Sequence, residues 1–112
     1  MKQVMLLASE DMSEILRDAL DNKYIILPCS DPDISGALLG SSPDVLILDL
    51  FLPGTDGLAF LRTYAKDLPP VVMVLTRFIS EALLQELAVL GVSSVIRVPC
   101  TPSCLREQLS KY

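Results

Sequence analysis

Two residues with chemically useful side chains follow apolar runs in the middle of the chain. Residues 45–48 lead into the carboxylate of Asp49, and residues 71–75 lead into the hydroxyl of Thr76. If both runs are neighbouring parallel strands, the two side chains lie at the same edge of a sheet. A carboxylate there can accept a phosphoryl group as an acyl phosphate, and the hydroxyl can hydrogen-bond a phosphoryl oxygen. The spacing therefore indicates a candidate phosphoryl-acceptor site that a divalent cation would assist.

Apolar runs and helical patterns alternate along the chain, which predicts an α/β fold. Apolar runs typical of strands covered on both faces lie at residues 4–8, 24–27, 45–48 and 71–75, and residues 94–98 are expected to form a fifth strand. Helical spacing predicts helices over residues 9–20, 31–39, 57–67, 80–90 and 102–111. We expect Pro28 to stop the second strand, Asp56 and Ser80 to cap helices, Gly91 to end one and Pro102 to begin another. The pattern predicts a doubly wound parallel sheet in one domain, residues 1–112.

Composition excludes several classes of function. The 112 residues carry 9 basic and 14 acidic side chains, a formal charge of −5, and an acidic chain repels the phosphate backbone of nucleic acids. No apolar run approaches the ~20 residues of a membrane-spanning helix. The absence of His excludes His-dependent triads and His-ligated metals, and three Cys do not make a disulfide framework. We therefore expect a cytoplasmic protein, made without a cleaved leader, that binds neither nucleic acid nor membrane.

The stretch over residues 44–57 resembles the phosphoacceptor strand and loop of the receiver domains of bacterial response regulators. It reads D-V-L-I-L-D-L-F-L-P-G-T-D-G, and Thr76, Gly91 and Pro99 stand where that family has its switch hydroxyl, a helix-end Gly and a Pro after the fifth strand. The resemblance covers the whole chain. It implies a (βα)5 flavodoxin-like fold with strand order 2-1-3-4-5. It also implies that a histidine kinase or phosphotransfer protein phosphorylates Asp49.

The metal-binding residues depart from the family pattern. The family holds Mg²⁺ with an acidic pair after the first strand, and a gap-free alignment places Leu7 and Ala8 at those positions. The ligands that the resemblance still implies are Asp49 and the backbone carbonyl of Phe51. Glu10 joins them only if the loop after the first strand is re-formed. This set under-coordinates a divalent cation. We therefore expect weak Mg²⁺ binding.

The positive charge that the family places near the phosphoryl group is also displaced. Val98 stands where the family has a Lys, and strand alternation sends the neighbouring Arg97 to the opposite face. Val95 occupies the position of the family's aromatic switch residue. Arg77, directly after the switch hydroxyl, is either a solvated surface residue or a replacement cation, because a guanidinium can grip phosphate without a metal.

Each candidate also has a purely structural explanation. Asp49 can cap a turn or the following helix, and Thr76 can simply end a buried strand. Residues 11–14, D-M-S-E, have the form of an acidic capping box, which needs no metal. Cys100 and Cys104 have the spacing of one helix face, and two thiolates alone make a weak metal site. We assign the two cysteines to packing.

The helix expected over residues 80–90 is apolar over nearly half its circumference, through Leu83, Leu84, Leu87, Ala88 and Leu90. The resemblance places the output face of the family on this helix and the strand at residues 94–98. We expect Leu83, Leu87 and Leu90 to remain partly exposed in a monomer and to support homodimer formation or docking of an effector domain. Complete burial of the helix in the core is the alternative.

The sequence favours a signalling module over an enzyme. The leading hypothesis is a receiver of a two-component phosphorelay in which Asp49, Thr76 and Pro99 converge in a shallow acidic depression. The alternative is a pseudo-receiver whose protein contacts do not depend on phosphorylation. A dehalogenase-type phosphatase needs a second Asp where Phe51 stands. A flavin site needs a Ser/Thr/Gly-rich loop after the first strand, and residues 8–11, A-S-E-D, are too acidic for it.

Overall fold

The structure is a computed structural model that describes residues 2–20, 23–29, 39–40, 42–50, 56–98 and 101–112. Only the backbone of Glu10, Pro28, Cys29 and Pro102 is described. Strands and helices alternate in these residues as β1 (Lys2–Leu7), α1 (Glu10–Leu20), β2 (Tyr24–Cys29), β3 (Val45–Asp49), α3 (Gly57–Thr63), β4 (Val71–Thr76), α4 (Glu81–Val89), β5 (Ser94–Arg97) and α5 (Pro102–Ser110). The helix expected over residues 31–39 lies almost wholly outside the described residues.

All strand pairs are parallel, and the five-stranded sheet has the order β2-β1-β3-β4-β5. β1 lies between β2 and β3, so β2 is added on one side of β1 and the later strands are added on the other side. The carboxyl ends of β1 and β3 therefore flank the topological switch point, where ligands bind in folds of this kind. The doubly wound sheet and the strand order expected from the sequence are confirmed.

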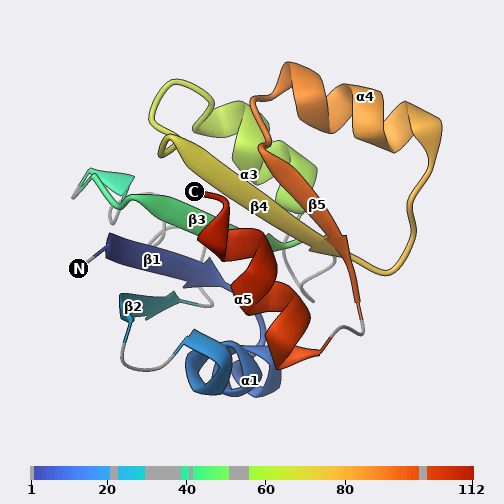
Figure 1. The fold of residues 1–112 in the computed structure, drawn as a ribbon. Coiled ribbons are helices and arrows are strands. Elements are labelled where there is room, and N and C mark those ends of the chain that lie inside the picture. The colour runs from blue at the N-terminus through green and yellow to red at the C-terminus, as the bar shows by residue number, and fades with distance from the viewer. Residues whose placement is uncertain (1, 21–22, 30–38, 41, 51–55, 99–100) are drawn as a thin grey trace.

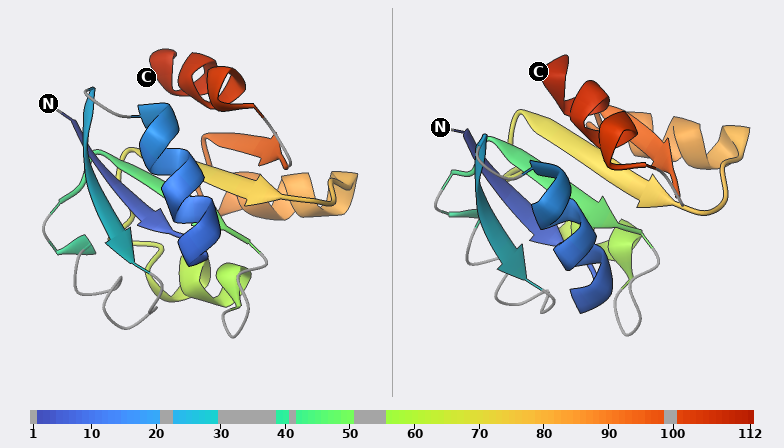
Figure 2. Two further views of the ribbon diagram at one scale, coloured as in Figure 1. Left: turned by 90° about the horizontal axis from the view of Figure 1, so that it is seen from below. Right: turned by 60° about the horizontal axis from the view of Figure 1, so that its bottom comes forward.

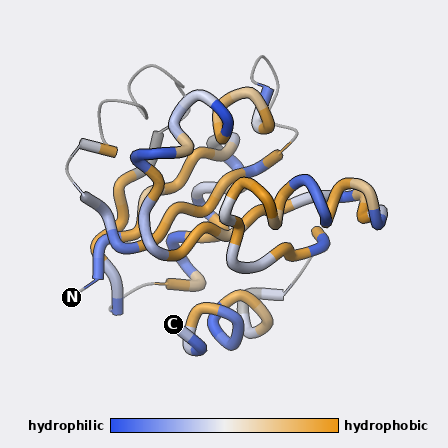
Figure 3. The backbone as a smooth tube through the Cα atoms, turned by 90° about the horizontal axis from the view of Figure 1, so that it is seen from above, coloured by the Kyte–Doolittle hydropathy of each residue, from blue (hydrophilic) through white to orange (hydrophobic). Residues whose placement is uncertain are grey.

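Helices cover both faces of the sheet, so the molecule has three layers (Figures 1 and 2). α1 and α5 pack side by side on one face, over a core cluster that includes Leu6, Ile47 and Leu75. α3 and α4 lie on the other face, over a cluster that includes Leu48 and Val74. Figure 3 shows hydrophobic colouring along the central strands. Because both faces are covered, these strands are continuously apolar instead of alternating.

Side-chain oxygens cap the starts of the helices. The Asp56 carboxylate accepts a hydrogen bond from Ala59 N at 3.1 Å, and the Ser80 hydroxyl accepts one from Leu83 N at 3.1 Å. The expected capping box over residues 11–14 is wrong. The cap of α1 is Ser9, whose hydroxyl accepts from Met12 N at 3.3 Å, because the helix begins at Glu10 and its first free N–H groups lie just beyond.

The ends of β2 and α3, and the exposure of one residue of α1, differ from the expectation. β2 continues through Pro28 to Cys29, because an edge strand has one side that needs no N–H donor. α3 ends at Thr63, and residues 64–67 form a turn in which Asp67 N donates to Tyr64 O at 2.8 Å. Ile15 was expected on the buried stripe of α1, but its side chain is 47% exposed because it lies beside the stripe through Leu16.

Candidate functional site

Asp49 and Thr76 are the last residues of two neighbouring parallel strands. In the register of β3 and β4, Asp49 lies opposite Leu75, so Thr76 is one residue further along. A hydrogen bond from Leu50 N to Leu75 O, 3.0 Å long, continues the pairing past the strand end. Asp49 is half-buried, whereas Thr76 is 1% exposed. The two residues therefore share the carboxyl edge of the sheet; Pro99, the third expected member, lies outside the described residues.

The Thr76 hydroxyl holds the first turn of the connection to α4. It donates to the carbonyl oxygen of Phe78 at 2.9 Å and accepts from the N–H of the same residue at 3.2 Å. A threonine hydroxyl has only one proton to donate. A phosphoryl oxygen at this edge would therefore compete with the Phe78 carbonyl for that proton.

The two residues that the gap-free alignment places at the family's acidic pair are part of the hydrophobic core. Leu7 is completely buried and Ala8 is 1% exposed. Glu10 begins α1 with its side chain outside the description, Phe51 lies outside the described residues, and Asp11 is exposed. Within the described residues, no group of three or more Asp, Glu, Cys or His side chains could hold a metal ion. The side chains that the structure describes therefore do not by themselves make a three-carboxylate Mg²⁺ site.

Two arginines lie at the carboxyl edge beside Thr76. The register of β4 and β5 pairs Thr76 with Arg97. Strand alternation assigns both to the face covered by α3 and α4, because Val74 and Val95 pack against the cluster on that face. Arg77 follows directly, and both arginine side chains are exposed. Val98 is 8% exposed and belongs to the opposite cluster, so Arg97 does not replace the family's Lys.

The exposure of the apolar residues of α4 agrees only in part with the expectation from the sequence. Leu87 is completely buried, and Leu83 and Leu90 are half-buried against the same cluster. The most exposed apolar residues are Phe78, Ile79, Leu84 and Val89. The expectation of partial exposure is confirmed for Leu83 and Leu90 and is wrong for Leu87, because the helix turns Leu87 into the cluster on this face of the sheet.

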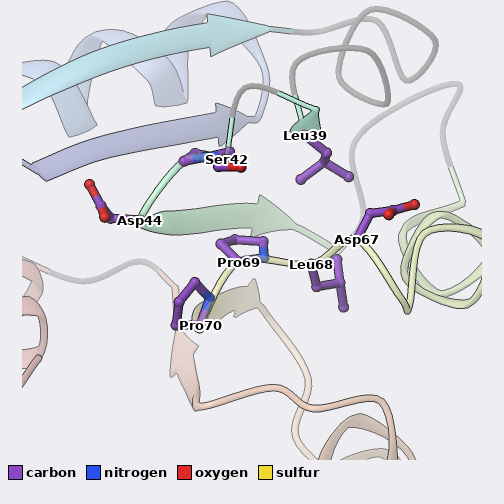
Figure 4. Close-up of a pocket in the computed structure, with 8 residues that line it drawn as sticks. Leu39, Ser42, Asp44, Asp67, Leu68, Pro69 and Pro70 are labelled. Carbon is purple, nitrogen blue, oxygen red and sulfur yellow. The ribbon is translucent and has the colours of Figure 1, made fainter.

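A pocket of about 250 Å³ lies at the opposite edge of the sheet, around the amino ends of β3 and β4. Leu39, Leu68 and a series of prolines supply its apolar lining. In Figure 4, the carboxylates of Asp44 and Asp67 lie at opposite sides and point away from each other. Asp44 accepts a hydrogen bond from Gln3 N at 2.8 Å. The pocket is thus separate from the site at Asp49 and has no convergent polar groups.

Sequence reasoning missed two features of the site. One is the pairing of Thr76 with Arg97, which depends on strand register and could not be read from the chain. The other is the turn between Thr76 and Phe78. Threonine hydroxyls in loops often hydrogen-bond the backbone two residues further along the chain. The Thr directly after the apolar run of residues 71–75 could therefore have indicated this turn.

Solved structures with a similar fold include receiver domains. The signal receiver domain of a putative Luxo repressor protein from Vibrio parahaemolyticus has a TM-score of 0.87 at 23% identity, over 98% of this chain and 88% of that one. Chemotaxis protein CheY4 of Vibrio cholerae gives 0.88 at 22% identity, over 99% and 98%. A two-component response regulator from Clostridium difficile gives 0.86 at 14% identity, over 99% and 94%. The chain therefore has the receiver fold that its sequence resembles.

Sequence comparison adds one partial relative. No family model matches the chain. Over 69 residues, or 59% of this chain, it is 41% identical to a protein-glutamate methylesterase/protein-glutamine glutaminase of Cereibacter sphaeroides. The chain spans only 18% of the length of that protein. Among the described residues, no helix is long and apolar enough to cross a membrane.

Proposed function

We propose that the chain is a receiver module of a two-component response regulator with Asp49 as its phosphoacceptor position. The observation that carries this proposal is the placement of Asp49 and Thr76 on neighbouring strands at the carboxyl edge of a receiver fold. The carboxylate of Asp49 is half-buried and lies at the edge where α/β sheets bind ligands. The module acts by protein contact and has no substrate of its own.

The chemistry at this edge is transfer of a phosphoryl group to a carboxylate. An Asp49 oxygen attacks phosphorus, the new P–O bond forms, and the bond to the donor histidine nitrogen or acetyl oxygen breaks with the electron pair on the leaving group. The Thr76 hydroxyl then turns from the Phe78 carbonyl to a phosphoryl oxygen. Arg77, exposed beside it, supplies the positive charge that Val98 lacks.

The partners follow from this role. A histidine kinase or phosphotransfer protein supplies the phosphoryl group, and the surface formed by α4 and β5 carries the signal to an effector domain or a second copy. The partial relative is a protein-glutamate methylesterase, of which the chain spans 18%. That proportion is consistent with a module that regulates a separate effector.

Phosphopeptide mass spectrometry after incubation with acetyl phosphate tests the proposal. We expect slow labelling confined to Asp49, abolished in Asp49→Asn and retained in Asp44→Asn, the matched control at the opposite edge of the sheet. If Arg77 holds the phosphoryl group, Arg77→Ala abolishes labelling while chelation of Mg²⁺ leaves it unchanged. Rapid labelling that depends strictly on Mg²⁺ would instead mean that Glu10 or Asp11 completes a metal site.

A pseudo-receiver is the second candidate, and one observation favours it. The positions that hold the metal in the family are the core residues Leu7 and Ala8, and the Lys position is the buried Val98. None of these side chains can ligate a cation or neutralise a phosphoryl group. Failure of acetyl phosphate and of phosphohistidine donors to label Asp49, in a folded protein, would select this candidate.

A further inference from the structure

The pocket at the amino edge of the sheet has an apolar wall (Figure 4). The wall comes from two turns, one before β3 and one before β4, and from one more distant leucine: Leu39, Pro43, Leu68, Pro69 and Pro70. We call the space between these five residues the proline pocket. Its volume of about 250 Å³ is below the roughly 300–1,000 Å³ of sites for whole small molecules. The proline pocket therefore suits one large side chain of a partner.

The sheet and the two turns hold the wall of the proline pocket in place. Val45 pairs with Val71 in the sheet, and this pairing fixes the two turns beside each other. The turn before β3 is fastened to β1, because Asp44 N donates to Gln3 O at 2.9 Å and Gln3 N donates to the Asp44 carboxylate at 2.8 Å. The turn before β4 contains two consecutive prolines, whose rings restrict φ. A partner therefore meets a preformed cavity, which lowers the entropy cost of binding.

Two carboxylates flank the proline pocket. Asp44 and Asp67 lie at opposite sides of it, and both residues are exposed (Figure 4). Among the residues that the structure describes, neither carboxylate is part of an ion pair. The whole chain has a net charge of −5, which attracts basic partners. An apolar cavity between two carboxylates matches a segment that has one apolar anchor and a positive charge on each side of it.

We propose that the proline pocket binds one aromatic side chain from an extended segment of a partner protein, with a Lys or Arg two residues before it and another two residues after it. In an extended chain, side chains two residues apart point to the same side and are about 6–7 Å apart. When the aromatic residue enters the pocket, the basic side chains therefore meet the surface on either side, where Asp44 and Asp67 lie. An aromatic side chain buries a large apolar area and has only two rotatable bonds, so it suits a rigid pocket.

A second copy of the chain fits the proline pocket less well. Among the described residues, the most exposed aromatic side chain is that of Phe78, at 73%. The residues two positions before and after it are Thr76 and Ser80, which carry no charge. The N–H and the carbonyl of Phe78 are also hydrogen-bonded to the Thr76 hydroxyl, so this segment is held in a turn. Two copies that each carry a charge of −5 repel each other as well.

The test uses three short synthetic peptides that differ only in the anchor and the charges. The first has Phe at its centre, Lys two residues to each side, and Gly or Ser elsewhere; the second has Glu in place of both Lys, and the third has Ala in place of Phe. Each is titrated into the full isotope-labelled chain, and backbone amide shifts are recorded by NMR. We expect the first peptide to shift amides of residues 42–46 and 67–72, and the other two to bind roughly tenfold more weakly. Equal binding of all three peptides, or shifts that map to other elements, would overturn the proposal.

Two variants remove the charges and leave the apolar wall unchanged. Asp44→Asn keeps an oxygen that can accept the hydrogen bond from Gln3 N, and Asp67→Asn changes an exposed side chain, so both proteins should stay folded. Each variant should weaken binding of the first peptide about two- to fivefold. Asp18→Asn, the same change at an exposed position of α1, should leave the affinity unchanged. Full affinity in a protein that carries both Asp44→Asn and Asp67→Asn would overturn the proposal.

Sedimentation velocity of the chain alone tests the second copy as the occupant. We expect the same oligomeric state in the unmodified chain and in the protein that carries both Asp44→Asn and Asp67→Asn. Self-association that the double variant abolishes would place a second copy in the pocket and would overturn the proposal.

The inference does not depend on the proposed function, because the proline pocket and Asp49 lie at opposite edges of the sheet. Asp49→Asn should therefore abolish labelling by acetyl phosphate and bind the first peptide with unchanged affinity. Peptide binding by a chain that acetyl phosphate does not label would refute the phosphoacceptor proposal alone. Labelling without peptide binding would refute the proline-pocket inference alone.

Discussion

Thr76 is placed so that phosphoryl binding and loop structure compete for one hydroxyl proton. The side chain is 1% exposed, and its hydroxyl both donates to and accepts from the backbone of Phe78. In the proposed phosphorylated form, the bond to the Phe78 carbonyl is exchanged for one to a phosphoryl oxygen. Because the turn leads directly into α4, this exchange would connect chemistry at Asp49 with the exposed surface of that helix.

Replacing Thr76 with Val should destabilise the protein by about 1–2 kcal/mol, because the two hydrogen bonds between its hydroxyl and the backbone of Phe78 are lost. Urea unfolding measures the change. Labelling of Asp49 should fall in the same variant, since the phosphoryl oxygen also loses its donor.

Two controls distinguish the hydroxyl from the shape of the side chain. Thr76→Ser keeps the hydroxyl and should retain labelling. Thr63→Val removes an exposed hydroxyl that donates to Ala59 O at 2.8 Å within α3, and it should change stability little. A Thr76→Val protein as stable as the original would contradict the importance of the turn.

The helices begin and end where local chemistry demands it. Gly57 opens α3 so close to Leu50 that an added Cβ would lie 2.9 Å from the Leu50 carbonyl oxygen. Gly91 ends α4 with a φ of +89°, a backbone conformation that residues with side chains rarely adopt. A Cβ added at Gly91 would meet no atom within 4 Å. The two glycines are therefore required for different reasons, one steric and one conformational.

Substitution series at the two glycines should separate these reasons. Gly57→Ala should cost roughly 1–3 kcal/mol because the backbone of Leu50 cannot move freely. Gly91→Ala should cost about 1 kcal/mol or more, and Gly91→Asn should recover part of it because Asn tolerates positive φ. Thermal and urea unfolding give the values. Recovery by Gly57→Asn would contradict the steric explanation.

At the scale of the molecule, apolar residues follow two strands at the carboxyl edge of the sheet, at positions where the gap-free alignment expects charged residues of the receiver family. β1 leads into buried Ala8, and β5 leads into buried Val98. The arginines at this edge, Arg77 and Arg97, are both exposed, and Arg97 lies on the face opposite to Val98. These apolar residues contribute to the core of the fold, and we expect them to leave Mg²⁺ binding weak.

Restoring the family's charges should restore metal binding. We expect the unmodified protein to bind Mg²⁺ weakly and Ala8→Asp combined with Val98→Lys to raise Mg²⁺ affinity and Asp49 labelling together. Calorimetric titration with Mg²⁺ and mass spectrometry measure the two effects. Both sites are buried, so a folded variant must first be confirmed by circular dichroism. Tight Mg²⁺ binding by the unmodified protein would contradict the argument.

Local sequence signals were enough for most elements and for two members of the candidate site. The apolar runs ending at Asp49 and Thr76, and the caps at Asp56 and Ser80, are statements about neighbours in the chain. Such signals failed where the end or the cap of an element depends on the elements around it. Pro28 remains in a strand because β2 is an edge, and Ser9 caps α1 because the strand before it ends early enough.

The alternation of strands and helices, the covered sheet and the strand end that carries Asp49 could all be predicted from the amino-acid sequence. These follow from periodicity, which each segment expresses without reference to the rest. Only the tertiary structure decided that Thr76 pairs with Arg97, that its hydroxyl binds Phe78, and that α4 exposes Val89 while it buries Leu87. Register, turn geometry and helix rotation depend on what packs against each element, and that information belongs to the assembled fold.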